Sequence, residues 1–361
     1  MSRKQSRLKD LFPGYFNFVM ATGIVSIAGY YIKQLTISDL LLWAAIIGYV
    51  ILITLFIIRI IFFPRAIGAD LLDSSKSFLF LTFVAGTDVL GVRIFLAGYV
   101  DVAIWLWVVA LVFWTALIYS SFSMLLLRHR QSVSEAVNGG WFLAVVGTQS
   151  LVLLGGRVTP YIPVSRPIML LLNFGAWAIG IVIYLIFITL VLYRLIFFEP
   201  ELEQTEPLQW IDMGAAAISA VGSVIILQAI QPTDFLAPLA SIIATVSLVL
   251  WAWAAWLIPL IVVYIAGRHI STREGFHYYP SYWSMVFPLG MFTQACWQVG
   301  TTLTIEPLKD FAQIFFWVAL GAWTLTAIGL AFSLRPNSKS IRINANRKNT
   351  QLTRKKRQLS H

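Results

Sequence analysis

Ten long apolar segments separated by short connections constrain this chain more than any other feature of its sequence. A bilayer core of ~30 Å needs ~20 apolar residues in a helical crossing, and each segment is near that length. Charged residues are only 12% of the chain, against ~25% in an ordinary soluble domain. The expected crossings are residues 12–32, 38–63, 76–98, 101–127, 139–156, 168–198, 209–230, 236–266, 281–304 and 309–334.

The segments are continuously apolar rather than alternating, which favours helices over transmembrane strands. The sequence therefore predicts an all-α integral membrane protein. Residues 1–11 would form a short N-terminal segment, 12–334 a single ten-helix transmembrane domain, and 335–361 a basic, disordered tail. The first apolar stretch continues past Tyr30 without a small-residue cleavage site, so a cleavable signal peptide is not expected.

The basic residues indicate how such a domain is oriented. Ten crossings place both termini on one side, and 21 of the 26 lysines and arginines fall in the segments on that side. Only four fall in the connections on the opposite side. Because Lys and Arg are enriched in cytoplasmic loops, both termini are predicted to be cytoplasmic and the protein to lie in the plasma or inner membrane. Because of this distribution, we interpret the net charge of +10 as a signal that orients the protein in the membrane rather than as a sign of nucleic-acid binding.

Odd-numbered and even-numbered segments differ in composition. Odd segments hold 15 of the 23 glycines and most of the uncharged polar side chains, whereas even segments hold ten of the 14 tryptophans. Tryptophan suits lipid-facing helices and interface belts, and small or polar residues suit buried helices. The pattern predicts five helical hairpins, with an inner ring of odd helices around a central pore. The alternative is that the glycines only let helices pack closely, without a conduit.

Charged residues fit the pore interpretation. Lys33, Arg93 and Arg157 lie at or near the outer ends of the first, third and fifth segments. We expect them to form a vestibule that attracts anions. The alternative is ordinary placement of basic residues at the membrane interface.

Residues that would support catalysis inside the membrane are scarce. The four histidines lie in connections or in the tail, without metal-ligand spacing, and the sequence contains no Walker A motif. Cys296 is expected to be a buried packing residue. We therefore predict no enzyme activity, no metal and no cofactor, and keep an intramembrane enzyme or a receptor with a buried pocket as the alternative class.

Three motifs then indicate a family. The run Phe-Pro-Gly-Tyr-Phe-Asn-Phe-Val-Met-Ala-Thr-Gly-Ile-Val-Ser-Ile at residues 12–27 resembles the first helix of the tellurite-resistance/dicarboxylate transporter family. That family includes the slow anion channel of guard cells and fungal malate and sulfite permeases. Trp-Phe-Leu-Ala-Val-Val-Gly-Thr-Gln at 141–149 resembles its fifth helix, and Tyr-Trp-Ser-Met-Val-Phe-Pro-Leu-Gly at 282–290 its ninth.

The resemblance implies five hairpins around a pore, a homotrimer with one pore per subunit, and passage of small anions. Transport would be channel-like or proton-linked, with C4-dicarboxylates such as malate as one substrate class. It also implies that Phe287, just before Pro288, closes the pore. Pro288 lacks an N–H for the Ser284 carbonyl, so a kink is expected beside Phe287. The alternative is that Phe287 is a core or lipid-facing residue.

The inner helices supply the residues that we expect to line the pore. These residues are all small or polar: Thr22, Gly23, Gly86, Asp88, Gly147, Gln149, Ser223, Gly290 and Thr293. Asp88 departs from the pattern expected of the family, because a carboxylate repels an anion. Three interpretations stay open for it: a structural pair with another helix, proton coupling of a carrier, or a different role.

Overall fold

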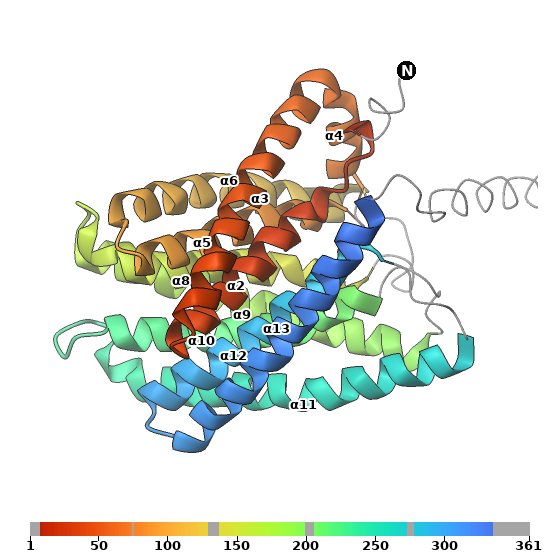
Figure 1. Cartoon of the computed structure of the whole chain (residues 1–361). Coiled ribbons are helices and arrows are strands. Elements are labelled where there is room, and N and C mark those ends of the chain that lie inside the picture. The colour runs from red at the N-terminus through yellow and green to blue at the C-terminus, as the bar shows by residue number, and fades with distance from the viewer. Residues whose placement is uncertain (1–7, 74–75, 129–136, 199–205, 273–277, 335–361) are drawn as a thin grey trace, which may run out of the picture.

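The computed structural model describes residues 8–73, 76–128, 137–198, 206–272 and 278–334 (Figure 1). Within these ranges the regular structure is helical, without strands. The α-helices are α2 (Asn17–Tyr31), α3 (Leu35–Phe62), α4 (Pro64–Leu71), α5 (Leu81–Leu96), α6 (Val100–Arg128), α8 (Leu143–Val158), α9 (Arg166–Phe197), α10 (Glu206–Ala229), α11 (Ala240–Thr272), α12 (Trp283–Thr302) and α13 (Glu306–Leu334). The predicted tail and the first seven residues lie outside the described residues.

Eight helical segments are long and apolar enough to cross a bilayer: those of α3, α5, α6, α8, α9, α10, α11 and α13. The expectation of an all-helical, multi-pass membrane protein is confirmed. The other two expected crossings coincide with α2 and α12. With its preceding 3-10 turn η1 (Pro13–Phe16), α2 extends over about 30 Å at 1.5–2.0 Å per residue. Ten crossings therefore remain a prediction.

Burial separates the helices into two sets. In the most apolar windows of α5, α8 and α10, 72–94% of residues are buried, against 17–28% in α3, α6, α9, α11 and α13. Nearly every residue of α2 and α12 is buried as well. The buried set is the odd-numbered set of the sequence, so glycine, tryptophan and polar content predicted correctly which helices are inside.

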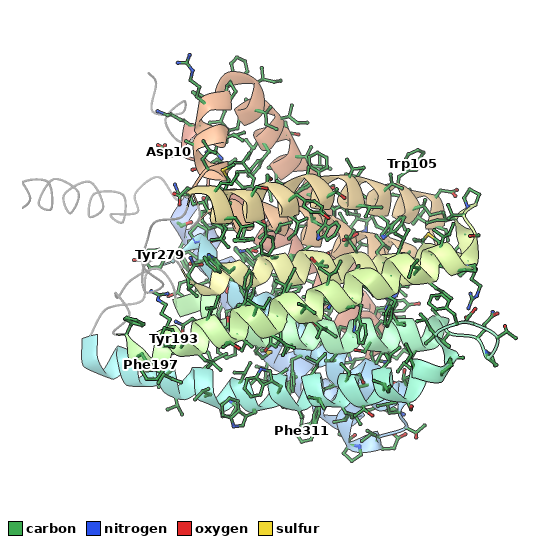
Figure 2. All side chains as sticks on the ribbon, turned by 180° about the vertical axis from the view of Figure 1, so that it is seen from behind. Asp10, Trp105, Tyr193, Phe197, Tyr279 and Phe311 are labelled. Atoms are coloured by element: carbon green, nitrogen blue, oxygen red, sulfur yellow. The ribbon has the colours of Figure 1, made fainter. Side chains whose placement is uncertain are left out.

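The buried helices contact one another in a closed order. α2 packs on α5, α5 on α8, α8 on α10, α10 on α12, and α12 returns to α2. We call these five helices the buried ring. Each also packs against the long helix that follows it in sequence, and these exposed helices lie outside the ring (Figure 1). Aromatic side chains such as Trp105 and Phe311 project outward from them (Figure 2).

Short repeated features begin and end the buried helices. Four of the five begin with a 3-10 turn: η1, η2 (Ser77–Phe80), η3 (Gly139–Phe142) and η6 (Pro280–Tyr282). At the opposite end of three of them the chain turns through a residue with positive φ: Lys33, Gly98 or Thr304. Such a residue closes a helix C-terminus, and each is followed by a backbone N–H that bonds five residues back. The recurrence is what a repeated structural unit predicts.

Five side chains on exposed helices hydrogen-bond to the buried helix of the next unit, and we call these contacts the cross-unit hydrogen bonds. Each joins an indole or phenol to a hydroxyl or thiol at 2.8–3.2 Å: Tyr49–Thr87, Trp114–Thr148, Trp177–Ser223, Trp251–Cys296 and Trp323–Thr22. The last one joins α13 to α2. The sequence analysis expected the tryptophan-rich helices to face lipid. Trp105 is 69% exposed, whereas the indole N–H groups of these four tryptophans bond to a buried helix, because an indole N–H removed from water requires an acceptor.

The glycines of the buried ring lie where two helices meet. A methyl group at Gly23 would lie 2.9 Å from Val89 of α5, and one at Gly290 would lie 2.8 Å from Ile24 of α2. Gly86 and Gly147 likewise face the adjacent buried helix. Their small size permits close helix packing, the alternative that the sequence analysis left open.

Candidate functional site

Contacts on either side of α12 define the direction of Phe287. Pro288 packs against Gly214 of α10, and Gly290 packs against α2. Gly300 faces α13 and Cys296 contacts α11. Because successive residues are rotated by about 100°, Phe287 lies between the α10 and α2 faces, opposite the exposed helices. This direction points to the middle of the buried ring. The side chain is fully buried, and α12 is continuous through Pro288.

The same face of α12 carries Met291, Gln294 and Gln298 toward the end of the ring where the inter-helix turns lie. The amide nitrogen of Gln294 is buried and has no hydrogen-bond partner. Sequence reasoning counted Gln294 and Gln298 among the polar residues of the odd segments but did not place them in the expected pore lining. The steps of four, three and four residues from Phe287 through Met291 and Gln294 to Gln298 were the signal that could have placed them on one face.

Arg157 lies at the end of α8, near this polar group. On α8 it is opposite the face of Thr148, which contacts α6, so it too is directed toward the middle of the ring. Its guanidinium donates to the Leu153 carbonyl and, at 3.5 Å, to the Tyr31 hydroxyl of α2. Arg157 forms no ion pair with any described residue.

Neutral side chains complete the group around Arg157. Tyr31 also interacts with Gln298 of α12. The amide of Gln228, on α10, donates to Gln298 at 3.5 Å and to Thr302 at 3.0 Å. Four of the five buried helices therefore meet here, and we call Arg157, Tyr31, Gln228, Gln298 and Thr302 the outer polar cluster. It offers one unpaired positive charge and several N–H and O–H donors, which is what an anion requires.

The other two predicted vestibule residues have different surroundings. Arg93 is 2% exposed and donates to Asp39 at 2.5 Å and to the hydroxyls of Ser26 and Ser38 at 3.1 and 3.0 Å. Its charge is paired, and its bonds join α5 to α2 and to the first turn of α3, an arrangement that periodicity within one helix did not reveal. Lys33 is exposed and is the positive-φ residue of the turn between α2 and α3.

A second arginine–aspartate pair lies at this end, outside the crossings. Arg166 donates to Asp234 at 2.9 Å, and the Asp234 carboxylate also accepts from the Gln231 N–H. The hydrogen bond from Arg166 lowers the pKa of Asp234. These bonds hold the connection between α10 and α11 against the start of α9.

Asp88 lies between two buried helices. Its Oδ2 accepts a hydrogen bond of 2.8 Å from Ser150 of α8, while Oδ1 is buried and has no partner. The partner on another helix that the sequence analysis allowed for is thus a hydroxyl rather than a cation. A buried carboxylate with one unpartnered oxygen is costly unless it binds a proton or an ion.

The polar residues expected to line a pore face other helices. Thr22 and Ser223 accept cross-unit hydrogen bonds, and the Gln149 amide donates to the Trp177 carbonyl of α9 at 3.0 Å. Thr293 donates to the Leu289 carbonyl of its own helix. The structure brings Thr22, Gln149 and Ser223 next to tryptophans, whereas Phe287 and Arg157 have the direction that a central path requires.

Fold and site together define a class: a helical membrane protein with a closed ring of buried helices and an unpaired cation near one end of it. Comparison with known proteins is more specific. The model of the family described as "Voltage-dependent anion channel" matches residues 10–331. The chain belongs to this family, which confirms the resemblance found in its motifs.

Several relatives are similar over most of the chain. A sulfite efflux pump of Trichophyton rubrum is 25% identical and covers 88% of this chain and 89% of its own. An uncharacterized transporter of Methanocaldococcus jannaschii is 22% identical, covering 90% and 95%. An uncharacterized membrane protein of Mycobacterium tuberculosis is 31% identical over 40% of this chain and 74% of its own. Relatives named as transporters support membrane transport rather than catalysis.

Proposed function

We propose that this protein carries small anions across the plasma or inner membrane through the middle of the buried ring. One observation carries the proposal: Phe287 of α12 and Arg157 of α8 both lie on the faces directed away from the exposed helices. A gated anion path needs an apolar side chain that can close it and a nearby cation that attracts the anion. Membership of the anion-channel family supports the same function.

Phe287 is proposed as the gate and Pro288 as the residue that fixes its position. Pro288 packs on Gly214, so the backbone next to Phe287 is held against α10. An aromatic ring across a narrow apolar passage blocks ions by size and by removing water. We propose that anions enter from the outer polar cluster, where Arg157 supplies the attraction.

Sulfite is the first substrate to test, because relatives that align over 88% of this chain are named sulfite efflux pumps. Nitrate, chloride and C4-dicarboxylates such as malate remain in the proposed substrate class. All carry negative charge that the donors of the outer polar cluster can bind.

Flux measurements in proteoliposomes test this function. We expect uptake of sulfite, nitrate, chloride or malate above that of empty liposomes. Permeabilising the liposomes with detergent should release the accumulated anion. The matched control is Lys309→Gln protein, which loses a half-buried lysine paired with the exposed Glu306. Absence of flux for all four anions, in wild-type and Phe287→Ala protein, would exclude the function.

Proton-coupled carriage is the second candidate, and Asp88 is the observation that favours it. Its Oδ1 is buried without a partner, so the carboxyl can bind a proton there. A pH gradient would then drive accumulation of the anion, whereas a channel would conduct without one. The assembly as a homotrimer, with one path per subunit, is proposed on the family resemblance.

A further inference from the structure

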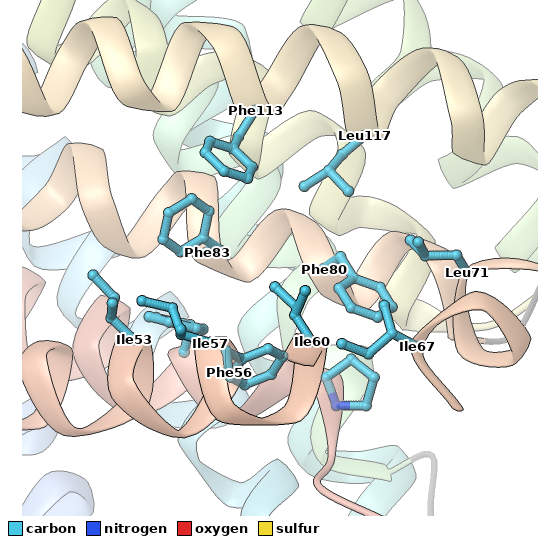
Figure 3. Close-up of a pocket in the computed structure, with 12 residues that line it drawn as sticks. Ile53, Phe56, Ile57, Ile60, Ile67, Leu71, Phe80, Phe83, Phe113 and Leu117 are labelled. Carbon is cyan, nitrogen blue, oxygen red and sulfur yellow. The ribbon is translucent and has the colours of Figure 1, made fainter. Parts of the chain in front are cut away.

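A deep apolar groove opens on the outside of the molecule between two exposed helices (Figure 3). Ile53 and Ile57 of α3 form one wall, and Phe113 and Leu117 of α6 form the other. Phe80 and Phe83, at the start of α5, form the floor. The groove has a volume of about 380 Å³ and its lining is entirely apolar. It does not belong to the proposed anion path, because it lies between helices outside the buried ring.

A charged pocket of about 330 Å³ adjoins one end of the groove. The two share Pro13 of η1 in their walls. The pocket is lined by three basic and two acidic residues: Lys9, Arg59, Lys76, Asp10 and Asp70. Lys76 is paired with Asp70 at 3.1 Å and lies 3.6 Å from Asp73 at the rim, so three basic and three acidic residues gather here.

Arg59 is the unusual residue of this pocket. It is 1% exposed, at the end of α3. Its Nε and Nη2 donate to the Lys9 carbonyl at 3.1 and 3.0 Å, and Nη2 also bonds Asp70 at 2.5 Å. The remaining nitrogen, Nη1, is buried without a hydrogen-bond partner. A buried guanidinium N–H without an acceptor is costly, and an anionic oxygen in the pocket would satisfy it.

We propose that groove and pocket together bind one anionic phospholipid, with the phosphate at Arg59 and Lys76 and an acyl chain along the groove. The anionic oxygens of a phosphate diester are the acceptors that the unpartnered N–H of Arg59 requires. Bulk lipid is as apolar as the groove, so the chain adds little preference of its own. The phosphate therefore decides which lipid is preferred, and the groove favours an anion that carries an acyl chain over a soluble one.

Native mass spectrometry of the full-length protein in detergent tests this proposal. The probes are dioleoyl phosphatidylglycerol, dioleoyl phosphatidylcholine and soluble glycerol 1-phosphate at equal concentration. We expect one retained phosphatidylglycerol per chain, and weaker retention of the other two. Lys76→Gln should lower the retained fraction about fivefold, whereas Lys309→Gln, at the opposite end of the helices, should not change it.

A variant that fills the groove provides a second test that leaves the buried, hydrogen-bonded Arg59 unchanged. Ile57→Trp should abolish retention, while Ile51→Trp, at an exposed position of the same helix outside the groove, should leave it intact. Equal retention of all lipids, or of glycerol 1-phosphate and phosphatidylglycerol alike, would overturn the proposal. Loss of an oligomer in Ile57→Trp with unchanged lipid retention would also overturn it, and would assign the groove to a second copy of the chain.

Discussion

Phe287 is the residue on which the proposed conduction depends most directly. Replacing it by alanine should raise anion flux strongly, because the ring that closes the path is removed. If the ring is instead a packed core residue, the same change would cost ~3–5 kcal/mol of stability and leave flux low. Liposome flux and thermal unfolding of Phe287→Ala, each against wild type, separate these outcomes. Phe316, also fully buried but on α13, supplies the matched control Phe316→Ala.

Arg157 and Arg93 should behave differently although both were expected in the vestibule. Arg157→Gln removes an unpaired charge, so anion flux should fall, and more at 10 mM than at 500 mM salt, since ~10 mM salt screens over ~30 Å and molar salt over ~3 Å. Arg93→Gln removes the partner of Asp39, Ser26 and Ser38, so folded yield should fall instead. An equal effect of both variants on flux at either salt concentration would contradict this assignment.

Asp88 should matter through the proton that its free oxygen can bind. If it couples protons, Asp88→Asn should abolish the response of flux to a pH gradient while downhill flux persists. If Asp88 only pairs with Ser150, Ser150→Ala should lower folded yield as much as Asp88→Asn does. Normal yield together with a normal pH response in Asp88→Asn would remove both roles.

At the scale of helices, the cross-unit hydrogen bonds should contribute separately to stability. Trp323→Phe removes the donor to Thr22 and should cost about 0.6 kcal/mol and at most about 1.7 kcal/mol, as double-mutant cycles give for hydrogen bonds between membrane helices. Trp317→Phe, on the exposed side of the same helix, should cost less. Thermal unfolding in detergent compares the two. A larger loss in Trp317→Phe would show that the cross-unit bond does not stabilise the structure.

Helix identity was predictable from the sequence, whereas helix facing was not. Runs such as that of α3 are apolar enough to specify a crossing by length alone. Thr22 and Ser223 were correctly expected on buried helices but face tryptophans of other helices. The direction of a side chain on an almost wholly buried helix depends on its neighbours. A 3.6-residue period gives no signal when every face is covered.

At the scale of the whole molecule, the orientation in the membrane can be tested by fusion. A reporter active only in the cytoplasm should work after Leu334 and in the connection between α6 and η3, because 21 basic residues fall on that side. A fusion at Gly98, in the turn between α5 and α6, should be inactive. Activity of a periplasm-only reporter between α6 and η3 would contradict the ten-crossing arrangement.

The ring order has a consequence for how the chain is made. α2 is synthesised first, yet its permanent neighbour α12 and the indole of Trp323 emerge last. Until then the face of α2 that carries Ile24 and Val25, and that later meets Gly290 of α12, must be covered by lipid or by an insertion factor. Each later buried helix can pack on the preceding one as soon as it is made, but the contact between α2 and α12 forms only after all five have been made. During biosynthesis the buried ring is therefore incomplete, because α2 and α10 each lack the neighbour that α12 later supplies. A chain shortened before α12 would leave the ring incomplete permanently.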